Sequence, residues 1–154
     1  MASRAPTVST HSDSRIIQAP RERIFDLVAD VERYPEFLPL WLGARVYRHR
    51  DETTYYTEQE VGLGMLHERF RTKTVMTRPS AIQVTSHDGL FRDFRILWTF
   101  AEAGTADKPA CRADIALTWE VRSRLMQRAI DLVLPETARS MVRAFDRRAR
   151  QTAA

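Results

Sequence analysis

Hydrophobic and polar residues alternate most regularly in two segments of the chain, residues 91–100 (FRDFRILWTF) and 112–121 (RADIALTWEV). From Phe94 in the first segment and from Ala113 in the second, every second position is apolar, and the positions between are mostly charged or hydroxyl-bearing. Alternation with period two predicts β-strands with one buried face and one solvent-facing side, which is typical of antiparallel sheets. The apolar positions are Phe94, Ile96, Trp98 and Phe100 in the first segment, and Ala113, Ile115, Leu117, Trp119 and Val121 in the second.

Five further segments are predicted to be strands. Residues 8–17 are a weak candidate near the start of the chain. Four stronger runs, rich in aromatic, β-branched and alternating residues, cover 44–50, 53–61, 67–76 and 81–87. Glycine, proline and acidic residues separate these runs, as expected for turns between antiparallel neighbours.

Helical spacing of apolar residues occurs in two places. Residues 19–34 are predicted to form a short helix with Pro20 as its first residue, and another helical turn or two follows in YPEFLPLW. Residues 123–151 are predicted to form a long C-terminal helix, in which Pro135 either introduces a kink or starts a second helix. The apolar stripes are Ile24, Phe25, Val28 and Val31 in the first helix, and Met126, Ile130, Val133, Ala138, Met141, Val142, Phe145 and Ala149 in the last.

This order of elements predicts an α+β fold. A curved antiparallel sheet would wrap around the long C-terminal helix, because no other element is long enough to cover the apolar face of the sheet. Two short helices would follow the first strand. The stretch VERYPEFLPLW, residues 31–41, places large apolar side chains beside two prolines, so it either fills the core or closes one end of a cleft between helix and sheet.

Length and composition limit the class of protein. A chain of 154 residues predicts one domain, spanning 1–154, with residues 1–7 as an irregular start. No run approaches the ~18 apolar residues of a membrane span. The single cysteine, Cys111, excludes an internal disulfide and agrees with a reducing cytoplasm.

Positive charge is concentrated at the C-terminal end. The formal net charge is +4, and eight arginines and three acidic residues lie between Arg122 and Arg150. A basic helix face of this kind is either an ordinary solvated surface or a contact for RNA, anionic lipid or an acidic protein. In the RNA case the phosphate contacts would be Arg139, Arg143, Arg147, Arg148 and Arg150.

The residues that carry chemistry in enzymes are scattered. His11, His49, His67 and His87 lie on different predicted strands or turns without metal-ligand spacing. Glu58, Glu60 and Glu68 lie in the middle strands, where each faces either solvent or the cleft. Because no nucleophile, base and orienting group fall into a recognisable pattern, the sequence predicts a binding protein rather than an enzyme.

Three motifs resemble the START-domain coenzyme Q-binding family. The family signature D-V-x-x-Y-P-x-F-x-P is similar to this chain at Asp30, Val31, Tyr34, Pro35, Phe37 and Pro39. GLFRDFRILWTF resembles the family's Gly-x-Phe and following aromatic strand, and MVRAFDRRARQ resembles its C-terminal motif. Two departures are Leu40-Trp41, where members often have Trp-Cys, and Gly89-Leu90-Phe91, where many have Gly-Pro-Phe.

The resemblance, which runs from about Val8 to Gln151, implies a helix-grip (START-like) fold with a deep apolar cavity. It implies that the cavity holds ubiquinone or a similar isoprenoid lipid as a bound ligand, with no cofactor, and that the protein is a lipid chaperone supporting respiration. The same broad family includes a bacterial toxin that binds the large ribosomal subunit, and related proteins are polyketide cyclases and dehydrases. Fold alone does not choose among these functions.

We therefore expect a ubiquinone-binding protein of a bacterial cytoplasm, with transient contact at the anionic inner membrane. The ribosome-directed toxin is the alternative, and a polyketide cyclase is third. The expected pocket is about 300–1,000 Å³. Its predicted lining residues are Tyr34, Phe37, Leu38, Trp41, Phe70, Phe94, Trp98, Trp119, Met141 and Phe145.

Overall fold

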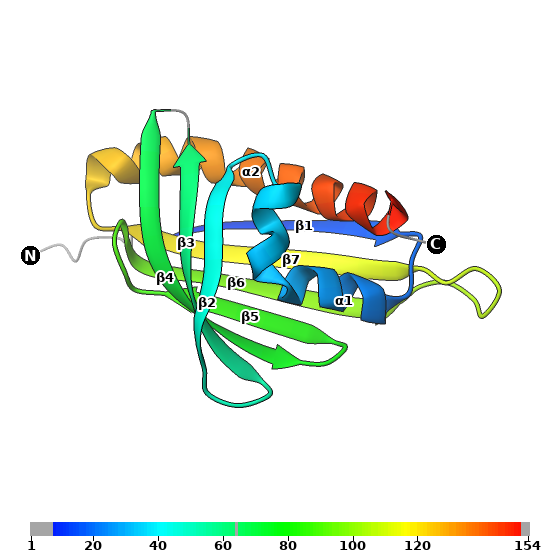
Figure 1. Cartoon of the computed structure of the whole chain (residues 1–154). Helices are drawn as coiled ribbons and strands as arrows, with labels where there is room; N and C mark the ends of the chain where they lie inside the picture. Colours follow the sequence, from blue (N-terminus) through cyan, green and yellow to red (C-terminus); the bar gives the residue numbers. More distant parts are fainter. Residues whose placement is uncertain (1–7, 64, 152–154) are drawn as a thin grey trace, which may run out of the picture.

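A seven-stranded antiparallel sheet curves around one long helix in the computed structural model, which describes residues 8–63 and 65–151 (Figure 1). The predicted irregular start, residues 1–7, lies outside the described residues. The elements in chain order are β1 (Ser9–Ile17), α1 (Arg21–Ala29), the 3-10 helix η1 (Val31–Glu36), β2 (Trp41–His49), β3 (Thr54–Leu63), β4 (Leu66–Thr77), β5 (Ala81–Ser86), β6 (Phe91–Glu102), β7 (Cys111–Val121) and α2 (Arg124–Gln151). The predicted α+β helix-grip architecture is confirmed.

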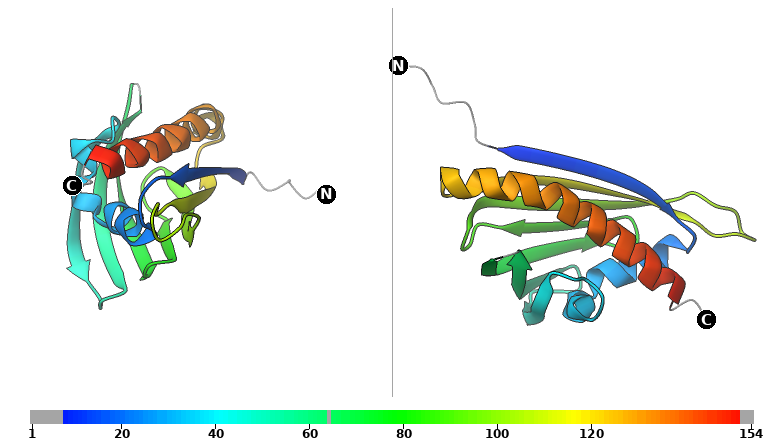
Figure 2. Two further views of the ribbon diagram at one scale, coloured as in Figure 1. Left: turned by 90° about the vertical axis from the view of Figure 1, so that its right-hand side faces the viewer. Right: turned by 90° about the horizontal axis from the view of Figure 1, so that it is seen from above.

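The strand order in the sheet is β1-β7-β6-β5-β4-β3-β2, and all neighbours are antiparallel. Strands β2 to β7 therefore form a simple meander, and β1 pairs with the last strand rather than with β2. Seen end-on, the sheet bends so that its concave side faces α2 (Figure 2). The bend leaves β2, β3 and β4 on one side of the helix and β1, β7 and β6 on the other.

The period-two pattern correctly assigns the buried face of the sheet. Trp98 and Phe100 of β6 are each 2% exposed, and Trp119 of β7 is 1% exposed. Arg95 and Thr99, between these positions, are exposed. The apolar face therefore packs toward α2, and the charged face meets solvent.

Helix α2 packs along the concave face as one helix from Arg124 to Gln151, with Pro135 inside it. The alternative of a second helix starting at Pro135 was wrong. Its buried stripe includes Ile130, Met141 and Phe145, the last only 1% exposed. Because Phe145 makes edge contacts with Tyr34, Phe37 and Trp98, with ring centroids 5.3–5.5 Å apart, it joins the helix to η1 and to β6.

The first helix ends earlier than its apolar stripe predicts. Helix α1 stops at Ala29, and the chain continues as η1, while Pro20 precedes the helix instead of being its first residue. Two tyrosine hydroxyls replace the missing helical donors: Tyr34 donates to the carbonyl of Val28, and Tyr55 donates to that of Ala29 at 2.7 Å. These bonds satisfy carbonyls that a helix end leaves unpaired.

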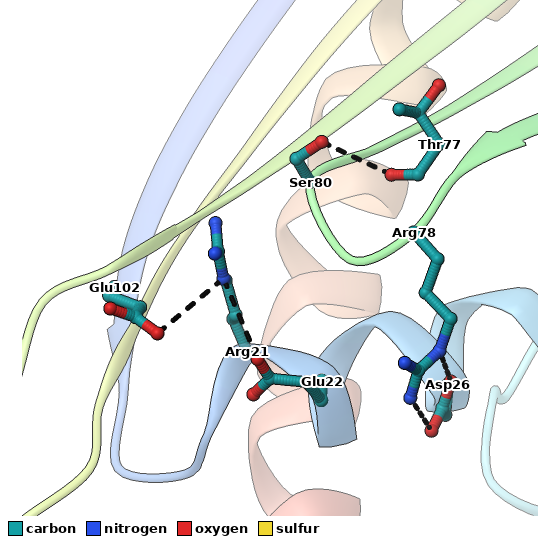
Figure 3. A network of polar contacts seen from close by, with 7 residues as sticks. All are labelled: Arg21, Glu22, Asp26, Thr77, Arg78, Ser80 and Glu102. Carbon is teal, nitrogen blue, oxygen red and sulfur yellow. Dashed lines mark hydrogen bonds and ion pairs between the residues drawn. The ribbon is translucent and has the colours of Figure 1, made fainter. Parts of the chain in front are cut away.

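Polar contacts hold the outer side of α1 to the sheet (Figure 3). Arg78, in the turn after β4, makes two hydrogen bonds to the carboxylate of Asp26, at 3.0 and 3.1 Å. Arg21 lies between Glu22 and Glu102, with N–O distances of 3.8 and 3.9 Å. Helix α1 is thereby held against the ends of β4 and β6, which positions the η1 segment over α2. None of the helices in the described ranges is long and apolar enough to cross a membrane.

Candidate functional site

The space between α2 and the concave face of the sheet contains an apolar cavity. Strands β2 to β7 and helix α2 all contribute to its wall. Its enclosed volume is about 60 Å³, well below the expected ~300–1,000 Å³. The aromatic rings of Phe91 and Phe94, with centroids 4.5 Å apart, and that of Phe70, at about 6 Å from both, fill much of the space that the curved sheet leaves.

A larger groove at the surface, which we call the mouth, adjoins the cavity. The mouth has a volume of about 350 Å³ and lies between Pro39–Trp41 on one side and residues 133–141 of α2 on the other. Four residues line both spaces: Leu40, Trp41, Thr137 and Met141. A ligand that enters through the mouth would therefore meet the cavity directly behind it, and the segment 39–41 forms one lip, as the prediction for VERYPEFLPLW requires.

A strip of buried polar side chains crosses the floor of the cavity. The indole N–H of Trp41 donates to Oε1 of Gln59 at 2.8 Å, and Nε2 of Gln59 donates to the hydroxyl of Thr57 at 3.0 Å. The hydroxyls of Thr57 and Thr72 are 2.5 Å apart. Gln59 and Thr72 line the cavity, so the strip presents an amide and a hydroxyl to whatever fills it.

The three glutamates of the middle strands separate into two groups. Glu58 lies on the outer face of the sheet between Arg45 and Arg71, with N–O distances of 3.8 and 3.6 Å, and Glu60 lies on the same face beside His67 and Arg69. Glu68 is half-buried and lines the cavity. Of the three, Glu68 is therefore the carboxylate that a ligand could contact.

The ten predicted lining residues fall into two sets. Trp41, Phe70, Phe94 and Met141 line the cavity. The other six, Tyr34, Phe37, Leu38, Trp98, Trp119 and Phe145, pack in or against the core beside it. Three members of the second set, Tyr34, Phe37 and Trp98, contact the ring of Phe145, which lies where α2 meets η1 and β6. Contact between a ligand and any of the ten stays a prediction.

Several lining residues were not predicted from the sequence. Leu134 lines the cavity from α2 and is 7% exposed. Gln59 and Thr72 were passed over because they are polar and stand among charged residues. The available signal was the alternation of β3: Tyr55 and Val61 are apolar, and Thr57 and Gln59 share their parity and therefore their inward face.

The histidines and the cysteine do not converge on the cavity. His11, His49 and His67 lie on β1, β2 and β4, and His87 follows β5. Among the residues that the structure describes, no three His, Cys, Asp or Glu side chains are grouped to hold a metal ion. Cys111 is fully buried at the start of β7, and burial raises its pKa to about 11, so its thiol stays protonated at neutral pH.

Most of the C-terminal arginines proposed as phosphate contacts already have acidic partners. Glu136 pairs with Arg139 at 3.4 Å and with Arg143 at 2.9 Å. Arg148 pairs with Glu36 at 2.8 Å, and Arg150 with Asp146 at 3.3 Å. These pairs are what a solvated helix face makes, although exposed pairs of this kind still exchange partners easily.

Comparison with known proteins gives consistent similarities. The family described as "Polyketide cyclase / dehydrase and lipid transport" matches residues 17–146. The chain is 33% identical to the ribosome association toxin RatA of Pseudomonas aeruginosa, over 94% of this chain and 98% of the toxin. It is 26% identical to the mitochondrial coenzyme Q-binding protein COQ10 homolog B of Xenopus laevis, over 90% of this chain and 57% of that protein. A START superfamily protein from Mycobacterium smegmatis has the same fold, with a TM-score of 0.80 at 17% identity, covering 92% of this chain and 97% of that one.

Proposed function

The chain belongs to the polyketide cyclase / dehydrase and lipid transport family, and from this premise we propose that it binds an isoprenoid lipid such as ubiquinone between α2 and the sheet. The observation that carries the proposal is that cavity and mouth adjoin and share four lining residues, Leu40, Trp41, Thr137 and Met141, so that a movement of the lip would open an apolar path from the protein surface to the polar strip. The protein would act as a lipid chaperone for respiratory electron transport. The coenzyme Q-binding relative supports the choice of ligand.

The two spaces suit the two parts of such a ligand. A quinone ring carries oxygen atoms, and the strip formed by Trp41, Gln59 and Thr72 supplies amide and hydroxyl partners at the end of the path. An isoprenoid tail is purely apolar and would lie in the mouth against Leu40, Val133 and Met141. Because the enclosed volume is small, the lip at residues 39–41 has to move away from α2 when a ring enters.

Removal of the tail from water supplies the free energy of binding. At about 25 cal/mol per Å² of apolar surface, even a few hundred Å² contributes several kcal/mol before ordering costs. Glu68, at the cavity wall, is a carboxylate that could accept a hydrogen bond from a ring hydroxyl. A reduced quinol, which carries such hydroxyls, would then be held differently from the oxidised quinone.

The proposal assigns binding rather than catalysis to this cavity. The family description also covers cyclases and dehydrases, and these reactions need a positioned acid and base. The polar groups on the wall are Gln59, Glu68, Thr72 and Thr137. Gln59 and the two threonines make hydrogen bonds within the protein, which leaves Glu68 as a lone carboxylate suited to orienting a ligand.

Mass spectrometry of lipid extracted from the purified protein tests the proposal. We expect a quinone in near-stoichiometric amount, and a loss of most of it in Trp41→Asp, because a carboxylate at the lip makes the entry of an apolar tail costly. Tyr47→Asp, on the outer side of the same strand, is the matched control and should keep its lipid. Protein without any isoprenoid lipid, or full occupancy in Trp41→Asp, would refute the assignment.

Ribosome association is the second candidate, and the 33% identity to a ribosome association toxin over nearly its whole length favours it. This activity would use the outer surface of the protein instead of the cavity. Sucrose-gradient profiles of cells overproducing the protein distinguish the two: accumulated free subunits indicate ribosome association, and an unchanged profile with quinone bound indicates the lipid function.

A further inference from the structure

The first half of α2 carries large apolar side chains on the face turned away from the sheet. Leu125 is 79% exposed and Leu132 is 83% exposed. The two lie seven residues apart on one helix face, with exposed Ala129 between them. The opposite face of the same helix is buried in the core, so these leucines are not needed for folding. Two leucines this exposed on one helix face, two turns apart, favour a contact surface.

A further exposed apolar side chain, outside α2, belongs to the β3–β4 hairpin. Met65, at the tip of the β3–β4 hairpin, is fully exposed. In Figure 1 and in the left view of Figure 2 this hairpin tip reaches the same side as the outer face of α2. The loop between η1 and β2, which supplies the lip of the mouth, lies on this side as well (Figure 1). Leu132 directly precedes Val133, which lines the mouth, so the exposed apolar side chains lie on the same side of the molecule as the entrance to the cavity.

Positive charge accompanies these side chains. Arg124 and Arg128 are exposed on the same half of α2. Within the described part of the chain neither has an ion pair, in contrast to Arg139 and Arg143, which share Glu136. The first half of the helix thus combines apolar tips with guanidinium groups that are free to meet an external anion, whereas the second half has its charges partly neutralised.

We propose that Leu125, Leu132, Met65, Arg124 and Arg128 form a docking face for an anionic lipid bilayer, with the mouth turned toward the membrane. The leucines and the methionine enter the region between headgroups and acyl chains, and the arginines contact lipid phosphates. Arginine stems extend far enough to keep the charge at headgroup level while nearby apolar groups go deeper. The occupant of the cavity then passes between protein and membrane without crossing water.

The chemistry of the docking face distinguishes a bilayer from other partners. A second copy of the chain would cover the leucines, but it would also bury Arg124 and Arg128 against a helix half that carries the same positive charge and supplies no anion for them. A nucleic-acid backbone would satisfy the arginines and leave both leucines in water. An anionic bilayer supplies hydrocarbon and phosphate together, in the order of depth that the face requires.

The docking face serves the proposed lipid function and rests on it, because docking brings the cavity to the membrane. Binding to the membrane is tested separately from the binding of lipid in the cavity. The purified protein is sedimented with vesicles of phosphatidylcholine alone or of phosphatidylcholine mixed with phosphatidylglycerol. We expect binding to the anionic vesicles that weakens as salt is added. Leu125→Ser with Leu132→Ser should weaken binding roughly tenfold or more, and Arg124→Gln with Arg128→Gln about fivefold for each arginine.

A matched control lies on the outer face of the sheet. Leu97, 40% exposed on β6, and its exposed neighbour Arg95 offer the same two residue types away from the mouth. Leu97→Ser with Arg95→Gln should leave vesicle binding unchanged. The lipid content of all variants is measured in parallel: docking variants that keep their lipid but lose vesicle binding separate the docking face from the cavity.

Labelling gives a direct readout of insertion. In Leu132→Cys a dye that senses polarity reports on this position, because the native Cys111 is fully buried and stays unmodified. We expect a blue shift on anionic vesicles and none for Leu97→Cys. The proposal is overturned if the wild-type protein binds neither kind of vesicle, or if the leucine variants bind anionic vesicles as well as the wild type does. It is also overturned if the protein is a dimer that the leucine substitutions dissociate, or if these substitutions abolish ribosome binding and leave vesicle binding unchanged.

Discussion

The indole N–H of Trp41 donates a 2.8 Å hydrogen bond to the side-chain oxygen of Gln59, and this bond joins the first residue of β2 to the buried polar strip in β3. Trp41 lines both the cavity and the mouth, and Gln59 lines the cavity. The bond therefore holds the lip in its closed position between the two spaces, and it is the contact that a ring would have to break on entering. It also holds the amide of Gln59 in a definite orientation toward the two threonines.

Trp41→Phe tests this relationship because it keeps an aromatic ring and removes the N–H. We expect a loss of about 1 kcal/mol in the free energy of unfolding, since the oxygen of Gln59 loses its donor in a buried site. Urea denaturation followed by circular dichroism measures it. Gln59→Leu with Trp41→Phe should lose less than the sum of the two single losses, because both substitutions remove the same bond. A double variant that loses the full sum would contradict the coupling.

Phe145→Ala should be among the most destabilising substitutions in α2. Its ring contacts Tyr34, Phe37 and Trp98 and is 1% exposed, so truncation leaves a cavity where helix, η1 and sheet meet. We expect a loss of about 3–5 kcal/mol. Leu132→Ala in the same helix is the control and should change stability by less than about 0.5 kcal/mol. Equal losses for the two variants would mean that the exposed leucine is packed in solution.

Asp131 links three elements through one carboxylate oxygen. Its Oδ1 accepts hydrogen bonds from Ser9 at 2.6 Å, Trp119 at 2.8 Å and Gln127 at 3.0 Å. Asp131→Ala leaves the hydroxyl of Ser9 and the indole N–H of Trp119 without this acceptor, while Gln127 keeps its bond to Ser9 at 3.1 Å. We expect about 1–3 kcal/mol of destabilisation in urea unfolding. Asp131→Asn keeps an acceptor and should lose less. An alanine variant as stable as the asparagine variant would show that water replaces the carboxylate.

Period-two alternation was enough to predict the strands that carry Trp98 and Trp119, and helical spacing was enough to place Met141 and Phe145 against them. These features depend on local sequence order alone. The cavity volume depends on how the rings of Phe91, Phe94 and Phe70 pack against one another, which no local pattern records. The polar strip was missed for a related reason: Thr57 and Thr72 become partners only because β3 and β4 pair in this register.

Alkaline pH should destabilise the protein through buried acids. Burial raises the pKa of Cys111 to about 11 and that of Tyr55 to about 12, above the ordinary values of 9.0 and 10.0 for these groups. The folded state therefore holds these protons at pH values where the unfolded state has released them. Stability is complete below pH ~9 and falls as pH rises toward 11 and 12. For Cys111 the loss is on the order of 2 kcal/mol at pH 11.

Urea unfolding at pH 8 and pH 10.5 measures the effect. In Cys111→Ala the difference between the two pH values should shrink, because one of the buried acids is gone, while Tyr55 still contributes. Thiol titration gives an independent check: folded protein at pH 8 should react with a thiol reagent only at the rate of unfolding. Rapid reaction of Cys111 in the native state would contradict the assigned burial.

Charge reversal in the second half of α2 separates the two candidate functions. Arg139→Glu, Arg143→Glu and Arg147→Glu change exposed side chains that line neither the cavity nor the mouth, so the lipid content of the purified protein should stay the same. If the protein instead binds ribosomal RNA through this face, the same change removes phosphate contacts, and the salt dependence of ribosome binding falls with each lost contact. Polysome profiles of overproducing cells, with Arg92→Glu, Arg95→Glu and Arg112→Glu on the sheet as the charge-matched control, measure this. We expect unchanged profiles in every variant; free subunits that accumulate with the wild type and disappear only on reversal in α2 would establish ribosome association instead.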